Sequence, residues 1–277
     1  MNVARALLLG ALQGLTEFLP VSSTAHLYIL QALLKIQNDA VALSFDVVLH
    51  LGTGAALALA MGGEILRILR ELPLLFTGRP ARDPAARAVI LPLAAGTVPG
   101  VLAGLLLLKR VESLRTLGLI GLSMLVACAY FLFSERRGRR ILRERDLSKL
   151  TLADGLWIGL AQAAAGLMAG FSRSGLTIAT GRLRGLARGE AARFSFLLGL
   201  PIILGAGAKT LLDARKAAEL FAQPDVLAVG FGLSFLSGLA AVAFMVRFLR
   251  GHSLNWFVAY RMVLAAAILA AVSVGAL

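Results

Sequence analysis

The chain has 277 residues, of which 58% are hydrophobic and 16% are charged, with a mean hydropathy of +0.83. This composition excludes an ordinary water-soluble domain, and the apolar residues come in blocks of about twenty, the length of a helical membrane span. The 28 Lys and Arg residues outnumber the 15 Asp and Glu residues, but they lie in the connections between these blocks. We therefore interpret them as signals of membrane topology and expect no nucleic-acid partner.

The first segment in chain order, about residues 3–36, is apolar but broken. Glu17, Pro20, residues 22–24 and His26 break it. Because Gln13, Glu17 and His26 interrupt what would be the apolar core of a signal peptide, the segment is expected to stay in the mature chain. A second broken segment runs from about 153 to 185. Irregular backbone at membrane depth is tolerated only where protein or a wet cavity satisfies its polar groups. Each segment therefore predicts a re-entrant helix pair whose tip lines a cavity.

Six further segments are long enough to span a bilayer. They lie at about 40–61, 88–108, 113–133, 192–212, 225–246 and 254–276. The positive-inside rule places the Arg-rich connection 134–152 on the cytoplasmic side, together with the basic connection 62–87. Both termini are then expected to face outward.

The chain is thus predicted to be an all-α integral membrane protein with a single membrane domain, residues 1–277. Two repeats, about 1–134 and about 153–277, each contain one re-entrant helix pair plus three transmembrane helices, and a basic cytoplasmic loop of about 134–152 joins them. The halves enter the membrane from opposite sides, so the repeat has inverted topology, with six full spans in total. The two tips are expected to meet near the midplane of the bilayer.

The tips carry polar side chains that are costly in lipid and that therefore mark a functional site. Gln13 and Glu17, four residues apart, share one helix face of the first pair. In the second pair, Arg173 lies in a glycine-rich break and requires an anion. That anion is either Glu17, in a structural pair, or the phosphate of a ligand, with Glu17 holding a metal or a proton. The surrounding residues favour a phosphate; they are Gly170, Ser172, Ser174, Gly175 and Thr177.

For each of two histidines, the sequence allows two alternative roles. His26 lies three residues after Ser23, so the two side chains can face each other on one helix. This pair would activate Ser23 as a nucleophile, or the imidazole would only satisfy a helix carbonyl, and the spacing fits both. His50 lies in a predicted span, where a buried structural histidine is favoured over one that faces the cavity.

Two motifs carry a specific resemblance to a known family. Gln13-Gly-Leu-Thr-Glu17-Phe-Leu-Pro20-Val-Ser-Ser-Thr-Ala-His26 resembles the first signature of the undecaprenyl-diphosphate phosphatase family, the bacitracin-resistance type. Gly170-Phe-Ser-Arg-Ser-Gly-Leu-Thr177 resembles its second signature, and the similarity continues through 194–201 and 256–261, so it covers nearly the whole chain. Two positions depart from the family pattern. Ala169 replaces a usual Pro, and His50 stands where Gln or another polar residue is expected, which leaves its role open.

The resemblance implies a multi-pass enzyme of the bacterial cell membrane that removes the terminal phosphate of undecaprenyl diphosphate, a polyprenyl diphosphate lipid. It implies dependence on a divalent metal, Mg²⁺ or Ca²⁺, recycling of the cell-wall lipid carrier, bacitracin resistance, and a cavity that faces outward. Attack by Ser23 or by water is left open, and so is a homodimer. The implied catalytic residues are Glu17, Ser23, His26 and Arg173. Those implied to bind the diphosphate are Ser22, Ser172, Arg173, Ser174, Gly175 and Thr177, and the metal ligands are Gln13 and Glu17.

A second class of function remains open. Inverted repeats with broken helices are also the architecture of secondary transporters, so the chain could carry a lipid phosphate across the membrane, alone or alongside hydrolysis. Phosphate release in detergent micelles separates the two, because micelles have no second compartment. A purely structural scaffold fits the charged tips poorly.

Overall fold

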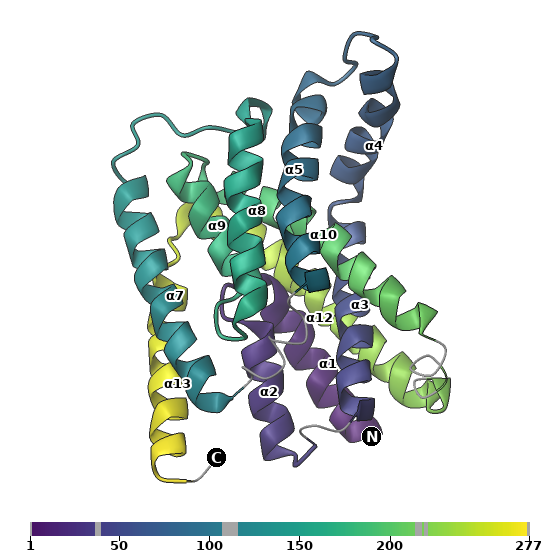
Figure 1. Ribbon diagram of the computed structural model, residues 1–277, viewed down its shortest axis with the longest axis vertical. Coiled ribbons are helices and arrows are strands. Elements are labelled where there is room, and N and C mark those ends of the chain that lie inside the picture. The colour runs from purple at the N-terminus through teal and green to yellow at the C-terminus, as the bar shows by residue number, and fades with distance from the viewer. Residues whose placement is uncertain (1, 37–39, 107–115, 214–217, 219–220, 276–277) are drawn as a thin grey trace.

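The computed structural model describes residues 2–36, 40–106, 116–213, 218 and 221–275, and every regular element in these ranges is a helix. The first half contains α1 (Val3–Phe18), α2 (Ser23–Leu33), α3 (Ala40–Ala60), α4 (Gly62–Phe76), α5 (Pro84–Leu106) and α7 (Leu117–Gly138). After the short 3-10 helix η1 (Leu147–Lys149), the second half contains α8 (Leu152–Leu167), α9 (Arg173–Leu183), α10 (Arg188–Leu212), α12 (Pro224–Gly251) and α13 (Asn255–Ser273). Figure 1 shows these helices as one bundle, and the expected all-α architecture is confirmed.

The helices that can span a membrane coincide with the predicted spans. Those long and apolar enough are α5, α7, α10, α12 and α13, and the bent pair α3–α4, counted as one, is a sixth. Helix α7 continues to Gly138, past the predicted end at 133, because the buried Ser134 and Glu135 bond to α9 and α10. The parts of the predicted spans at 107–108, 113–115 and 276 lie outside the described residues.

Helix α4 is a departure from the expectation of a loop over 62–87. It is bent by 78° from the helix before it. Ile65, Ile68 and Leu75 recur at helical spacing and pack against the main core, while charged residues occupy the other face. The charges lower the mean hydropathy of this stretch, so a search for apolar blocks in the sequence does not detect this amphipathic helix.

The two broken segments form helix pairs, as predicted, and the two pairs match in size. Helices α1 and α8 have 16 residues each, and α2 and α9 have 11 each. We call the connecting residues 19–22 the first tip and 168–172 the second tip. Each tip ends in a serine with a left-handed backbone, Ser22 with φ 74° and Ser172 with φ 67°, whose hydroxyl caps the following helix. Figure 1 shows the two hairpins entering from opposite ends of the bundle, so that their tips meet inside it.

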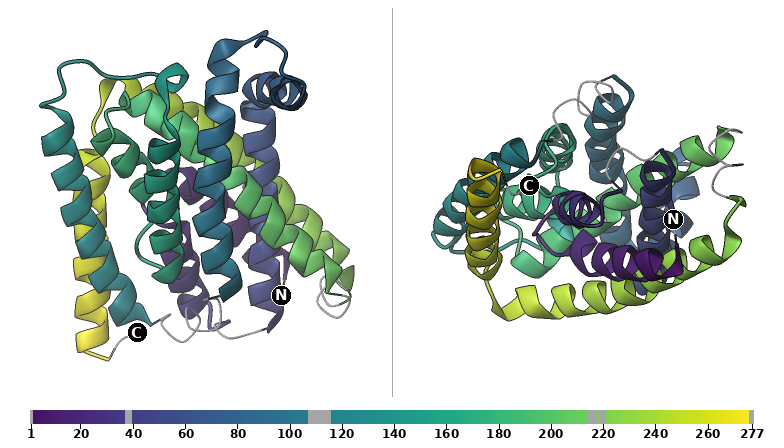
Figure 2. Two further views of the ribbon diagram at one scale, coloured as in Figure 1. Left: turned by 45° about the horizontal axis from the view of Figure 1, so that its top comes forward. Right: turned by 90° about the horizontal axis from the view of Figure 1, so that it is seen from below.

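Glycines set the position of each hairpin by close helix contact. Helix α1 packs along α12, and α8 packs along α5 (Figure 2). A Cβ added at Gly14 would lie 2.6 Å from the backbone nitrogen of Gly238, and one added at Gly159 would lie 2.2 Å from the carbonyl oxygen of Gly96. Small residues are what allow membrane helices to approach this closely. The first helix of each hairpin is therefore fixed against a long helix of the other half.

The end of the bundle opposite the two termini, at the top of Figure 1, carries paired charges. We call it the basic end. Asp154, fully buried in the first turn of α8, accepts hydrogen bonds from Arg145 at 3.0 Å and Arg184 at 2.7 Å. Burial by itself raises the pKa of Asp154, but these bonds and those of Thr151 outweigh it and lower the pKa to about 2. The ion pairs thus connect α8 and α9 at the side predicted to be cytoplasmic.

Candidate active site

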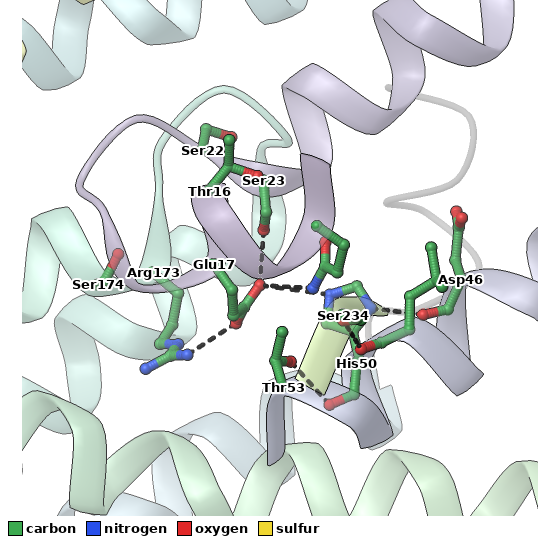
Figure 3. A network of polar contacts seen from close by, with 12 residues as sticks. Thr16, Glu17, Ser22, Ser23, Asp46, His50, Thr53, Arg173, Ser174 and Ser234 are labelled. Atoms are coloured by element: carbon green, nitrogen blue, oxygen red, sulfur yellow. Dashed lines mark hydrogen bonds and ion pairs between the residues drawn. The ribbon is translucent and has the colours of Figure 1, made fainter. Parts of the chain in front are cut away.

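Glu17 lies at the centre of the polar contacts between the two hairpins (Figure 3). Its Oε1 accepts a hydrogen bond from Arg173 Nη2 at 2.8 Å, and its Oε2 accepts from Ser23 Oγ at 2.6 Å and from Gln13 Nε2 at 3.0 Å. Only 7% of the Glu17 side chain is exposed. Gln13 and Glu17 share a face of α1, whereas Arg173 begins α9. The predicted meeting of the two tips is therefore confirmed.

Arg173 is held on one side by helix α10. Its Nη1 donates to the carbonyl oxygen of Ser195 at 3.2 Å, and its guanidinium packs on Gly199, where an added Cβ would lie 2.2 Å from Nη1. The side chain is 19% exposed. A guanidinium has five N–H groups, and the contacts with described residues use two of them. Arg173 thus pairs with Glu17 in this structure and retains donors for an anion.

The serine hydroxyls of the tips hold the two hairpins together. Ser22 Oγ donates to the carbonyl oxygen of Ala169 in the second tip, and Ser174 Oγ donates to the carbonyl oxygen of Leu19 in the first, at 3.1 Å. Ser172 Oγ lies 3.3 Å from Ser174 Oγ. The predicted phosphate-binding hydroxyls therefore make reciprocal bonds between the tips, and their role in binding a diphosphate stays a prediction.

Thr177 and Gly175 anchor the beginning of α9. Thr177 Oγ1 donates to the carbonyl oxygen of Arg173 at 2.7 Å and lies 2.6 Å from Ser195 Oγ. Gly175 faces the ring of Phe131, where an added Cβ would lie 2.2 Å from Cζ. These contacts fix the backbone that carries Arg173. Direct contact of either residue with a phosphate stays a prediction.

His26 and Ser23 do not form the pair that their spacing allowed. His26 Nδ1 lies 2.7 Å from the carbonyl oxygen of Ser22, and Nε2 lies 2.7 Å from the hydroxyl of Tyr260, with the two rings stacked. The Ser23 hydroxyl instead points to Glu17. The bond to the carbonyl four residues earlier turns the imidazole toward α13. Of the two alternatives, the structure therefore shows the carbonyl-bound histidine, and a catalytic role for His26 stays a prediction.

His50 faces the site, although the sequence favoured a buried structural histidine. Its side chain is 30% exposed, and its Nε2 lies 3.6 Å from Glu17 Oε2. Its Nδ1 lies 2.7 Å from the carbonyl oxygen of Asp46, one turn earlier on α3. Sequence spacing did not indicate this proximity, because it depends on how α3 is rotated against α1.

Arg261 is a residue of the site that the sequence reasoning did not single out. It is fully buried on α13 and donates to the carbonyl oxygen of Gly170 at 2.7 Å and to that of Pro20 at 3.3 Å. Its guanidinium lies 5.1 Å from the centre of the Phe131 ring. One side chain thus binds a carbonyl in each tip. An arginine inside an otherwise apolar span is itself the signal that could have identified it.

The predicted metal ligands are compatible with a hard cation. Within the part of the chain that the structure describes, no three His, Cys, Asp or Glu side chains gather as a complete metal site. Glu17 supplies a carboxylate, and the buried Oε1 of Gln13 has no hydrogen-bond partner among the described residues. Mg²⁺ typically takes one or two carboxylates and completes its shell with substrate phosphates and water. Gln13 and Glu17 fit that pattern.

Comparison with known proteins gives one consistent result. A family model described as "Bacitracin resistance protein BacA" matches residues 6–267. Three relatives named undecaprenyl-diphosphatase align over almost their full lengths. The protein of Rubrobacter xylanophilus is 42% identical over 98% of both chains, that of Thermomicrobium roseum is 40% identical over 99% of both, and that of Synechococcus elongatus is 38% identical over 100% of this chain and 96% of its own. The chain therefore belongs to the family of the bacitracin resistance protein BacA.

Proposed function

We propose that this chain is a metal-dependent hydrolase that removes the terminal phosphate of undecaprenyl diphosphate. The similar proteins that carry the name undecaprenyl-diphosphatase support this activity, and a multi-pass helical bundle suits a lipid-linked substrate. The observation that carries the proposal is one connected group of side chains. Glu17 accepts a hydrogen bond from the Ser23 hydroxyl at 2.6 Å and one from the Arg173 guanidinium at 2.8 Å.

In the proposed reaction, Arg173 binds the diphosphate, because a planar guanidinium offers paired N–H groups to phosphate oxygens. The Ser23 hydroxyl attacks the terminal phosphorus, and its proton passes to Glu17 Oε2. The bond from this phosphorus to the bridging oxygen breaks, undecaprenyl phosphate leaves, and water then releases phosphate from Ser23. A divalent cation held by Gln13 and Glu17 would neutralise the negative charge of the diphosphate.

We further propose that the site opens toward the exterior of the cell membrane, because the basic end would be cytoplasmic by the positive-inside rule. On that side, the product would return to cell-wall synthesis, and this recycling would be the basis of bacitracin resistance. Assembly of two chains into a homodimer stays a prediction.

The test is phosphate release from undecaprenyl diphosphate in detergent micelles. We expect turnover with Mg²⁺ or Ca²⁺, its loss with EDTA, and a fall of roughly 100-fold or more in Glu17→Gln and Ser23→Ala. The matched control is Ser134→Ala, because this buried hydroxyl bonds the carbonyl oxygen of Ala179 outside the site. Binding of the substrate without release would favour a carrier. Release at the wild-type rate by Ser23→Ala would favour direct attack by water.

A further inference from the structure

His50 directs its Nε2 toward the carboxylate of Glu17. His50 Nδ1 lies 2.7 Å from the carbonyl oxygen of Asp46. A carbonyl oxygen only accepts, so Nδ1 carries a proton, and in the neutral ring this tautomer leaves the lone pair on Nε2. Nε2 faces Glu17 Oε2 at 3.6 Å, on the side of Glu17 away from Arg173 (Figure 3). This arrangement offers a nitrogen and a carboxylate oxygen to a cation between them.

The distance between the two atoms, 3.6 Å, is close to that of two ligands of one metal ion. A nitrogen and an oxygen that each bind one divalent ion at about 2.1 Å, at right to tetrahedral angles, lie about 3.0–3.4 Å apart. The observed gap is close to this range. Histidine ligands of metals also usually donate their other ring N–H to a carbonyl or a carboxylate, as His50 does.

Gln13 supplies a third donor beside this pair. Its Nε2 contacts Glu17, while its buried Oε1 has no partner among the described residues. Rotation of the amide by half a turn exchanges the two atoms and offers the oxygen to a cation. His26 offers no comparable lone pair, because its Nε2 contacts the Tyr260 hydroxyl at 2.7 Å.

We propose that His50 Nε2 is a nitrogen ligand of the divalent cation that Glu17 and Gln13 hold, an inference that rests on the proposed function. The site is then a mixed nitrogen and oxygen site, completed by phosphate oxygens of the substrate and by water. Imidazole binds transition-metal ions, strongly Zn²⁺ and more weakly Mn²⁺, better than it binds Mg²⁺ and Ca²⁺, which prefer oxygen ligands. The chain should therefore bind Mn²⁺ more tightly than Ca²⁺, and His50 should be the cause of the difference.

The test is Mn²⁺ binding by the purified full chain in detergent, without substrate. Pulsed electron paramagnetic resonance detects a ligand nitrogen through its coupling to bound Mn²⁺, and ¹⁵N labelling of histidine changes this coupling without any substitution. We expect the coupling in the wild type and in the control His252→Gln, whose exposed ring lies against Phe248 far along α12. His50→Gln should lose the coupling and bind Mn²⁺ roughly 10-fold more weakly, with Ca²⁺ binding changed less than about twofold.

Three results would overturn the inference. They are wild-type protein that does not bind Mn²⁺, bound Mn²⁺ without a histidine nitrogen coupling, and a coupling that persists in His50→Gln. Phosphate release, measured on the same preparations, is a separate readout. Turnover without the nitrogen coupling would reject His50 as a ligand and leave the proposed hydrolase activity in place. Coupling without turnover would support His50 as a ligand and reject the proposed hydrolase activity.

Discussion

Replacing Gly199 by alanine should displace the Arg173 guanidinium while leaving the other proposed substrate-binding residues in place. The added Cβ would lie 2.2 Å from Nη1 and 2.6 Å from Cζ of Arg173. Ordinary contact requires about 3.5 Å, so the guanidinium has to move by about 1 Å. This movement would break or weaken its 2.8 Å bond to Glu17. Because the end of an arginine is flexible, the backbone of α10 can stay where it is.

The expected loss follows from the hydrogen bond that the displaced guanidinium can no longer make to the phosphate. A hydrogen bond to a charged group is worth about 1.5–3 kcal/mol, which corresponds to roughly 10- to 160-fold in kcat/KM. The assay is phosphate release in micelles, together with the thermal midpoint of unfolding. Gly205→Ala is the matched control, since its added Cβ meets open space on the same helix. Wild-type kcat/KM in Gly199→Ala would refute the reasoning, and so would a loss fully explained by a lower thermal midpoint.

Three further changes test other parts of the structure. Arg173→Lys should lower kcat/KM by roughly 10-fold or more, because an ammonium cannot reach both acceptors of the guanidinium. The control Arg188→Lys, at the basic end, should leave kcat/KM unchanged. Equal activity of the two variants would make Arg173 a structural partner only. Gly159→Ala should destabilise the protein by about 1–3 kcal/mol, since its Cβ would lie 2.2 Å from a backbone oxygen of α5. The control Gly166→Ala, in open space on the same helix, should be neutral or slightly stabilising. Equal thermal midpoints of the two variants would contradict the close packing of α8 on α5. The pKa of Asp154 is about 2 in the fold against an ordinary 3.8, so its stabilising contribution is present above about pH 4 and is lost as the pH falls through 2. The free energy of unfolding of the wild type should exceed that of Asp154→Asn by about 2 kcal/mol near neutral pH, and a gap that stays constant down to pH 2 would count against the pairing.

The fold was largely predictable because lipid leaves the backbone few choices. A long apolar block in a bilayer must be helical, and polar residues inside such a block must face protein or water, so the spans and both broken segments followed from the sequence. Helix α4 did not, because Glu64 and Arg67 belong to a charged face that hides its apolar one. The exact repeat boundaries, about 1–134 and 153–277, stay a prediction.

The centre of the site was predictable for a similar reason. A carboxylate and a guanidinium at membrane depth each require a partner, so the contact of Glu17 with Arg173 was one of the two alternatives that the sequence allowed, although the surrounding residues favoured a phosphate as the partner of Arg173. The orientation of the histidines did not follow. His26 turns toward Tyr260, which is 234 positions away in the chain, and spacing within one helix contains no information on such a contact. Arg261, like Arg173, is a guanidinium at membrane depth that requires a partner. Its acceptors are backbone carbonyl groups, which cannot be identified from a sequence pattern.

The 156 positions between Glu17 and Arg173 also matter while the protein is being made. At about 5–20 residues per second, a ribosome needs roughly 10–30 s to deliver the arginine after the glutamate. During that interval the newly inserted first hairpin carries an acidic group with no counter-charge, at a cost of about 3 kcal/mol on insertion scales. Delivery of Arg173 completes the charge pairing of this hairpin, so completion of translation is itself a step in stabilising it.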